Sequence, residues 1–129
     1  MIALDTETAL IAAGLKAPPL TCVSLATEGQ TLLEHVSEAH GLLQDTLTNP
    51  LVGHNIAYDM GVIAAEFPDL MPAIFQAYDE DHITDTELRE NLIHIAAGVY
   101  EGYGDEDGKV TRIHYGLAPC VKRHFGHEM

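Results

Sequence analysis

The chain has 129 residues, of which 47% are hydrophobic, and this suits one domain with a single core over residues 1–129. Its net charge of −14, from 20 acidic and 6 basic residues, argues against a free-standing nucleic-acid-binding protein, which normally carries a basic face. No apolar run approaches the length of a membrane span, and Met1 leads straight into the first predicted strand, so we expect no signal peptide and no membrane partner.

Three strands are predicted to open the domain, over residues 2–6, 20–26 and 30–36. A loop ending in Pro18-Pro19 separates the first two, and the turn Glu28-Gly29 makes a hairpin of the second and third. Cys22 lies in the second strand, and Cys120 also lies in an apolar segment. Both are interpreted as core residues in a reducing compartment.

The remainder of the chain alternates helices with short strands. Ser37 is a plausible N-cap for a helix over 37–48, and a buried strand is expected at 51–53. The other expected helices run from after Asn55 up to Pro68, near 74–78, over 87–98 and over 117–125, where Gly126 is the C-cap. A strand is expected over 82–86, and residues 102–108 are expected to form an exposed loop or hairpin tip with a returning arm at 109–114. This order predicts an α/β domain with a mixed sheet.

Two acids at the end of the first strand form the strongest candidate site. A strand alternates its faces with period two, so Asp5 and Glu7 point the same way. Like charges on one face repel each other, and a divalent metal would offset that cost. Carboxylate oxygens are the ligands that Mg²⁺ and Mn²⁺ prefer.

A second cluster follows the strand at 51–53. Asn55 and Asp59 are four residues apart, so we expect them to share one helical face. A buried strand that leads into such a helix could bring Asp59 to the end of the first strand, where Asp5, Glu7 and Asp59 would converge.

These motifs resemble the DEDD superfamily of 3′–5′ exonucleases, and more closely the proofreading exonuclease domain of family A (polymerase I-like) DNA polymerases. Asp5-Thr6-Glu7-Thr8 is similar to the family's first motif, and the run from Gly53-His54-Asn55 to Asp59 is similar to the second. Asp85-Thr86-x-Leu88 resembles the Asp-Thr-x-Leu step that precedes a helix in this family, and residues 117–126 resemble the helix before the third motif.

The resemblance implies a ribonuclease H-like sheet, three antiparallel strands followed by parallel ones, flanked by helices. It implies a two-metal site of Mg²⁺ or Mn²⁺ with Asp5, Glu7 and Asp59 as metal ligands and catalytic residues. It also implies that Thr6, Ile11 and Asn55 contact the substrate, a single-stranded or frayed DNA 3′ end.

The family's third motif, Tyr-x-x-x-Asp or His-x-x-x-x-Asp, is not found. His124 would need an acid at position 129, which is Met129, and Tyr103 with Asp107 lies before the last predicted helix instead of after it. We therefore expect a C-terminally incomplete exonuclease domain that cleaves poorly or not at all by itself. A covalently linked polymerase region, phage-type in character, and a bacterial or phage-infected host cytoplasm would fit this interpretation.

Two other functions stay open. One is a non-catalytic exonuclease-like interaction or scaffold module, and the other is an RNA-trimming exonuclease of the same superfamily. For single residues, Asp5 and Glu7 could be a solvated strand end, and Asp59 an exposed helix acid. Asp85 is interpreted as a helix cap and Tyr58 as a core residue, while the spacing of the histidines does not support a zinc site.

Overall fold

The computed structural model describes residues 1–11, 17–99, 103–104, 110–111 and 113–127. Two compact units make up the chain, residues 1–85 and residues 86–129, and each is described by itself. Among the described residues, no helix has the length and apolar character needed to cross a membrane.

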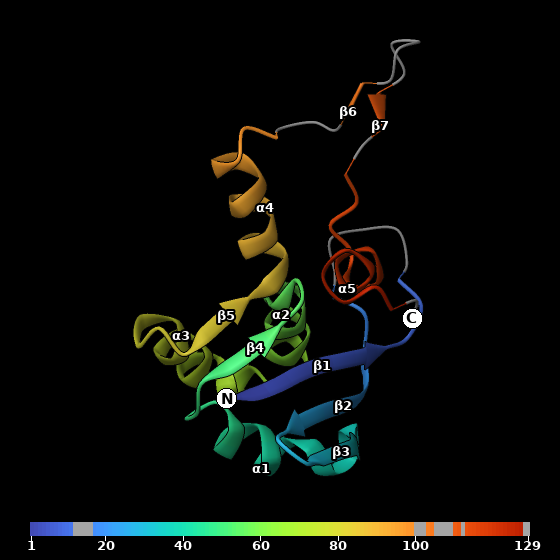
Figure 1. Ribbon diagram of the computed structural model, residues 1–129. Helices are drawn as coiled ribbons and strands as arrows, with labels where there is room; N and C mark the ends of the chain where they lie inside the picture. The colour runs from blue at the N-terminus through green and yellow to red at the C-terminus, as the bar shows by residue number, and fades with distance from the viewer. Residues whose placement is uncertain (12–16, 100–102, 105–109, 112, 128–129) are drawn as a thin grey trace. The chain divides into compact units, whose positions relative to one another are not determined.

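The first unit is built on a five-stranded mixed sheet with β1 at its centre (Figure 1). The sheet order is β3-β2-β1-β4-β5, in which β1, β2 and β3 pair antiparallel and β1, β4 and β5 pair parallel. The strands are β1 (Ile2–Thr8), β2 (Leu20–Thr27), β3 (Gln30–His35), β4 (Leu51–Gly53) and β5 (Ile83–Asp85). The predicted antiparallel opening and the parallel strands that follow it are both present.

Helix α1 (Val36–Thr46) begins earlier than predicted, and its N-cap lies two residues before the predicted one. The N-cap is His35, whose ring Nδ1 accepts a hydrogen bond from the backbone N–H of Ser37 at 3.3 Å. The predicted cap at Ser37 is therefore wrong, because Ser37 already lies in the first turn and is itself the donor. The imidazole nitrogen does here what a serine or aspartate oxygen usually does.

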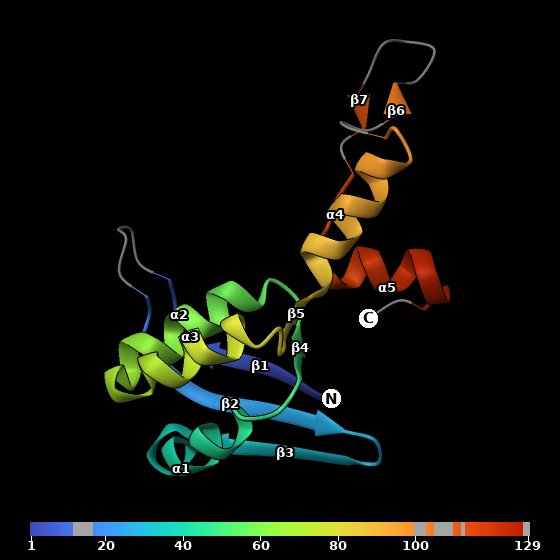
Figure 2. The same ribbon diagram turned by 90° about the vertical axis from the view of Figure 1, so that its left-hand side faces the viewer.

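Helix α2 (Ile56–Glu66), the 3₁₀ turn η1 (Pro68–Leu70) and helix α3 (Met71–Asp79) follow β4. Figure 2 shows α2 and α3 beside each other along one side of the sheet. Pro68 ends α2 and Pro72 lies in the first turn of α3, where a missing N–H costs nothing.

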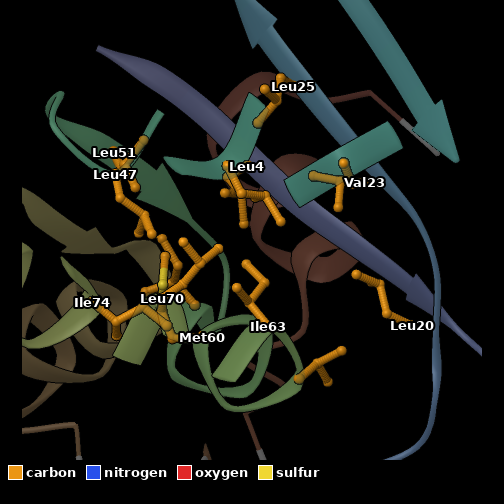
Figure 3. Close-up of a cluster of buried hydrophobic side chains, with 14 residues drawn as sticks. Leu4, Leu20, Val23, Leu25, Leu47, Leu51, Met60, Ile63, Leu70 and Ile74 are labelled. Atoms are coloured by element: carbon orange, nitrogen blue, oxygen red, sulfur yellow. The ribbon is translucent and has the colours of Figure 1, made fainter. Parts of the chain in front are cut away.

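One hydrophobic core joins the strands to all three helices (Figure 3). Leu4, Val23 and Leu25 line one face of the sheet, and Leu43 of α1 and Ile63 of α2 pack against that face. Since these residues belong to one buried cluster, the helices cover the same side of the sheet. The opposite side of β1 is left for Asp5 and Glu7, which are exposed.

The second unit contains helices α4 (Thr86–Ala96) and α5 (Leu117–Phe125) and the short antiparallel pair β6 (Tyr103–Gly104) and β7 (Val110–Thr111). The predicted hairpin around residues 102–114 is present as this strand pair, while its expected tip lies outside the described residues. Gly126 ends α5 with a left-handed φ of 70°, as predicted for a C-cap.

A buried carboxylate connects the two helices of the second unit. Glu90 of α4 accepts hydrogen bonds from Arg123 (Nη2 at 2.9 Å, Nε at 3.2 Å) and lies 2.9 Å from His124 Nε2. The bond with His124 and then that with Arg123 hold the pKa of Glu90 below its ordinary value of 4.5, against the opposing effect of burial. Cys120, the buried cysteine of α5, lies 3.1 Å from Arg123 Nη2 and is a free thiol.

We expect Gly53→Ala to lower the free energy of unfolding by about 1–3 kcal/mol. A Cβ at position 53 would lie 2.9 Å from Cβ and Cγ1 of Ile56, a side chain that is itself fully buried. Gly61→Ala is the matched control, because nothing lies within 4 Å of its added Cβ. In mid-helix that change should stabilise by about 0.5–1 kcal/mol. Urea unfolding followed by circular dichroism measures both, and equal effects of the same sign would contradict the packing described at Gly53.

Replacing Glu90 with Gln should lower the unfolding free energy by about 1–2 kcal/mol near pH 6, because two charge-assisted bonds are weakened. A carboxyl with a lowered folded pKa contributes stability that is complete above its unfolded value of 4.5 and is lost as the pH falls through the folded value. The difference between wild type and variant should therefore shrink below pH 4.5. Urea unfolding across pH 3–6 tests this, with Glu66→Gln at the exposed end of α2 as control; a difference independent of pH would contradict it.

Candidate functional site

The candidate site lies at the carboxyl ends of the parallel strands β1, β4 and β5. After β1 the chain moves to one side of the sheet through β2 and β3, and then to the other side through β4 and β5. Ligands of α/β sheets bind outside the carboxyl ends of strands at such a reversal of direction. The loops and helices that follow these strand ends therefore carry the residues to examine.

Asp5 and Glu7 point to the same face of β1, as their spacing predicted. Both side chains are exposed. Leu4, which precedes Asp5, is only 3% exposed, and Thr6, which lies between the two acids, is only 8% exposed. The register confirms the alternation, because Asp5 lies opposite Ser24 and Thr6 opposite the buried Val23. The two carboxylates therefore stand on the solvent-facing side of the strand.

Asp59 comes to β1 from the first turns of α2 and is 3% exposed. Its Oδ1 accepts two hydrogen bonds from Thr6, one from the backbone N–H at 2.9 Å and one from the hydroxyl at 2.6 Å. Parallel pairing between β1 and β4 covers only Ile2 and Ala3, so a carboxylate occupies the place that a neighbouring strand would take at Thr6. The interpretation of Asp59 as an exposed helix acid is wrong.

The pKa of Asp59 depends on its burial and on two residues of β1, Thr6 and Asp5. Burial raises the pKa of Asp59 above its ordinary value of 3.8, the two bonds from Thr6 oppose that rise, and the nearby charge of Asp5 adds to it. The pKa of Tyr78 is also raised above its ordinary value. Burial is the largest cause, and the negative charges of Asp85 and Asp59 add to it. Because burial and a like charge both disfavour the anion of Asp59, a cation in this region would be stabilising.

Asn55 does not share a helical face with Asp59, contrary to the prediction. It is the N-cap of α2, with a left-handed φ of 60°, and its exposed side chain makes no capping bond. A spacing of four residues places side chains on one face only when both residues are helical, and the helix begins at Ile56. The backbone N–H of Asn55 instead donates to Oδ1 of Asp85 at 3.1 Å. Asp85 thus has a structural role, in the turn before α2.

The remaining substrate-contact candidates lie in different environments. Thr6 is buried and its hydroxyl is bonded to Asp59, while Ile11 is 72% exposed in the segment after β1. Tyr58, predicted to be a core residue, is 37% exposed, and its hydroxyl lies 3.3 Å from that of Thr8. That prediction is wrong, because the buried side of α2 is formed by its neighbours and Tyr58 lies at the end of β1. Sequence periodicity could not show that Tyr58, next to Asp59 in the chain, is exposed.

The donor chemistry of Asp5, Glu7 and Asp59 fits Mg²⁺ or Mn²⁺, since all three offer hard oxygen ligands and a surplus of negative charge. Within the described residues, however, no three His, Cys, Asp or Glu side chains are placed as a ready-made set around one metal ion. The site therefore has suitable ligands, of which the exposed ones would still have to move to share an ion.

No protein-family model matches the sequence, and no curated protein matches it either. In fold, the chain is similar to the crystal structure of the Aedes aegypti Nibbler EXO domain, with a TM-score of 0.61 at 15% sequence identity. The match covers 98% of this chain and 59% of that structure, so the chain spans about three fifths of its length. The predicted ribonuclease H-like α/β fold, with its mixed sheet flanked by helices, is confirmed.

Removing the carboxylate of Asp59 should destabilise the protein more than removing that of Asp5. Asp59→Ala leaves a buried N–H and a buried hydroxyl of Thr6 without their acceptor, at a cost of about 1–3 kcal/mol. Asp5→Ala should leave the unfolding free energy unchanged or slightly raised, because it removes an exposed charge that repels Asp59. Urea titrations of the two variants decide this, and equal losses would contradict the role of Asp59 described here.

Proposed function

We propose that the chain is part of a divalent-metal-dependent 3′–5′ exonuclease that removes nucleotides from DNA 3′ ends. The observation that carries the proposal is the meeting of two elements: α2 brings a buried Asp59 onto the same short segment of β1 that presents Asp5 and Glu7. The fold similarity to the Nibbler EXO domain supports a nuclease. DNA as substrate and the 3′–5′ direction rest on the resemblance of the motifs.

Each acid has a role in this proposal. Asp5 and Glu7 bind metal from the exposed face of β1, and Asp59 binds through an oxygen that does not face Thr6. When bound, the divalent ions would supply an activated water and stabilise the leaving 3′ oxygen. Asn55 and Ile11 are exposed and available to position the nucleotide, and the segment that carries Ile11 begins directly after β1.

We also propose that a region linked to this chain supplies what the site lacks. A net charge of −14 gives the chain little to attract a phosphate backbone, so a linked polymerase region would supply much of the positive charge. The third motif implied by the resemblance, with its fourth acid, is absent from residues 1–129. We therefore expect these residues to bind metal weakly and to cleave poorly.

A second candidate is a non-catalytic exonuclease-like interaction module. The observation that favours it is that the described residues hold no ready-made set of three metal ligands. Against it stands the buried Asp59, because a scaffold gains nothing from burying a carboxylate against the strand segment that carries two other acids.

Calorimetry with Mn²⁺ and a nuclease assay distinguish the two candidates. The enzyme proposal predicts weak Mn²⁺ binding that Asp59→Ala abolishes, whereas Asp45→Ala, an exposed acid of α1, leaves it intact. Single-stranded DNA and RNA of one sequence, labelled at either end, would show substrate and direction.

The outcomes separate clearly. Slow, Mn²⁺-dependent shortening of DNA from the 3′ end supports the proposal in full, and preference for RNA would redirect it to an RNA-trimming enzyme. Brisk degradation would overturn the expectation that residues 1–129 are weakly active. Absence of any Mn²⁺ binding would overturn the enzyme proposal and favour the interaction module.

A further inference from the structure

Thr6 is out of place on its strand face. The buried positions that share the core side of the sheet with it are apolar, namely Leu4 on the same strand and Val23 and Leu25 on β2. A buried hydroxyl among apolar side chains is costly unless it is hydrogen-bonded. A valine of nearly the same shape would fill this position without that cost, so the hydroxyl itself requires an explanation.

The hydroxyl and the backbone N–H of Thr6 converge on one atom. Both donate to Oδ1 of Asp59, at 2.6 Å and 2.9 Å, across a sequence separation of 53 residues. Two donors in different directions fix both the position of this oxygen and the rotation of the carboxylate plane. The described residues place no hydrogen-bond donor from another residue on Oδ2, the second oxygen.

The location of Thr6 links this bond to the candidate site. It is the residue between Asp5 and Glu7, so one short backbone segment carries two acids on its exposed face and holds the third acid from its buried face. A carboxylate that is fixed through one oxygen presents the other in a defined direction. Groups that orient metal ligands in this way typically change metal affinity 10–100-fold when they are lost.

We propose that Thr6 is a positioning residue, which holds Oδ1 of Asp59 so that Oδ2 is directed toward a divalent cation shared with Asp5 and Glu7. This inference rests on the proposed function and changes the role expected of Thr6, from contact with the substrate to orientation of a metal ligand. The hydroxyl acts through Asp59 and touches neither the metal nor the nucleic acid.

The test measures Mn²⁺ binding by calorimetry in the absence of nucleic acid. Thr6→Val, which removes the hydroxyl and keeps the shape, should raise the Mn²⁺ dissociation constant by about 10-fold or more. Thr6→Ser keeps the hydroxyl and should bind Mn²⁺ like the wild type. Thr46→Val is the matched control, because Thr46 is also buried and its hydroxyl donates to Leu42 O at 2.7 Å within α1.

A merely structural role would make Thr6→Val and Thr46→Val alike, each losing stability and neither losing Mn²⁺ affinity, and that result would overturn the inference. A Thr6→Val protein that binds Mn²⁺ normally but binds a DNA oligonucleotide less tightly would also overturn it, in favour of substrate contact. If Thr6→Val does not fold, Thr6→Ala removes the same hydroxyl, and Mn²⁺ affinity equal to that of Thr6→Ser in that variant overturns the inference. If the wild-type chain does not bind Mn²⁺, both the proposed function and this inference are wrong. If the wild type binds Mn²⁺ and Thr6→Val binds it equally well, only the inference about Thr6 is wrong.

Discussion

The short pairing between β1 and β4 is the constraint on which the site depends. It covers Ile2 and Ala3 only, so β1 continues past its parallel neighbour toward Thr8. A buried backbone N–H in such a position needs an acceptor from elsewhere in the protein. The N–H of Thr6 finds it in the carboxylate of Asp59. A backbone requirement of the fold and the placement of a candidate catalytic acid are thus met by one contact.

The core determines that α2 can deliver this acid. Ile56, Met60 and Ile63 recur at helical spacing and are buried, which fixes the rotation of the helix about its axis and places Asp59 beside β1. Burying three such side chains contributes on the order of 5–9 kcal/mol. That exceeds the few kcal/mol that a buried carboxylate costs when it keeps hydrogen bonds. The packing of these apolar side chains therefore holds the carboxylate of Asp59 in a buried position that is unfavourable for the carboxylate alone.

The order of antiparallel and then parallel strands follows from the family resemblance, whereas period-two and helical patterns predict the strands and helices themselves and the shared face of Asp5 and Glu7. These are local properties, since each depends on residues a few positions apart. The N-cap at His35 was missed because any side chain with a suitably placed acceptor can cap a helix. The left-handed backbone at Asn55 is not predicted by a local pattern, because its backbone N–H bonds to Asp85, which is 30 residues away in sequence.

The burial of Asp59 could not be predicted, because its partner is 53 residues away and a charged helix residue is ordinarily exposed. The same long-range contact divides the acids of the site into two kinds. Asp59 is held in place within the protein, whereas Asp5 and Glu7 are exposed and repel each other, so their side chains would be ordered only by a cation between them. Each side chain that must still be ordered costs of the order of 1 kcal/mol on binding. A ligand fixed in advance by Thr6 removes one such cost, and the cost of ordering the two exposed side chains explains why this part of the site would hold a metal ion only weakly.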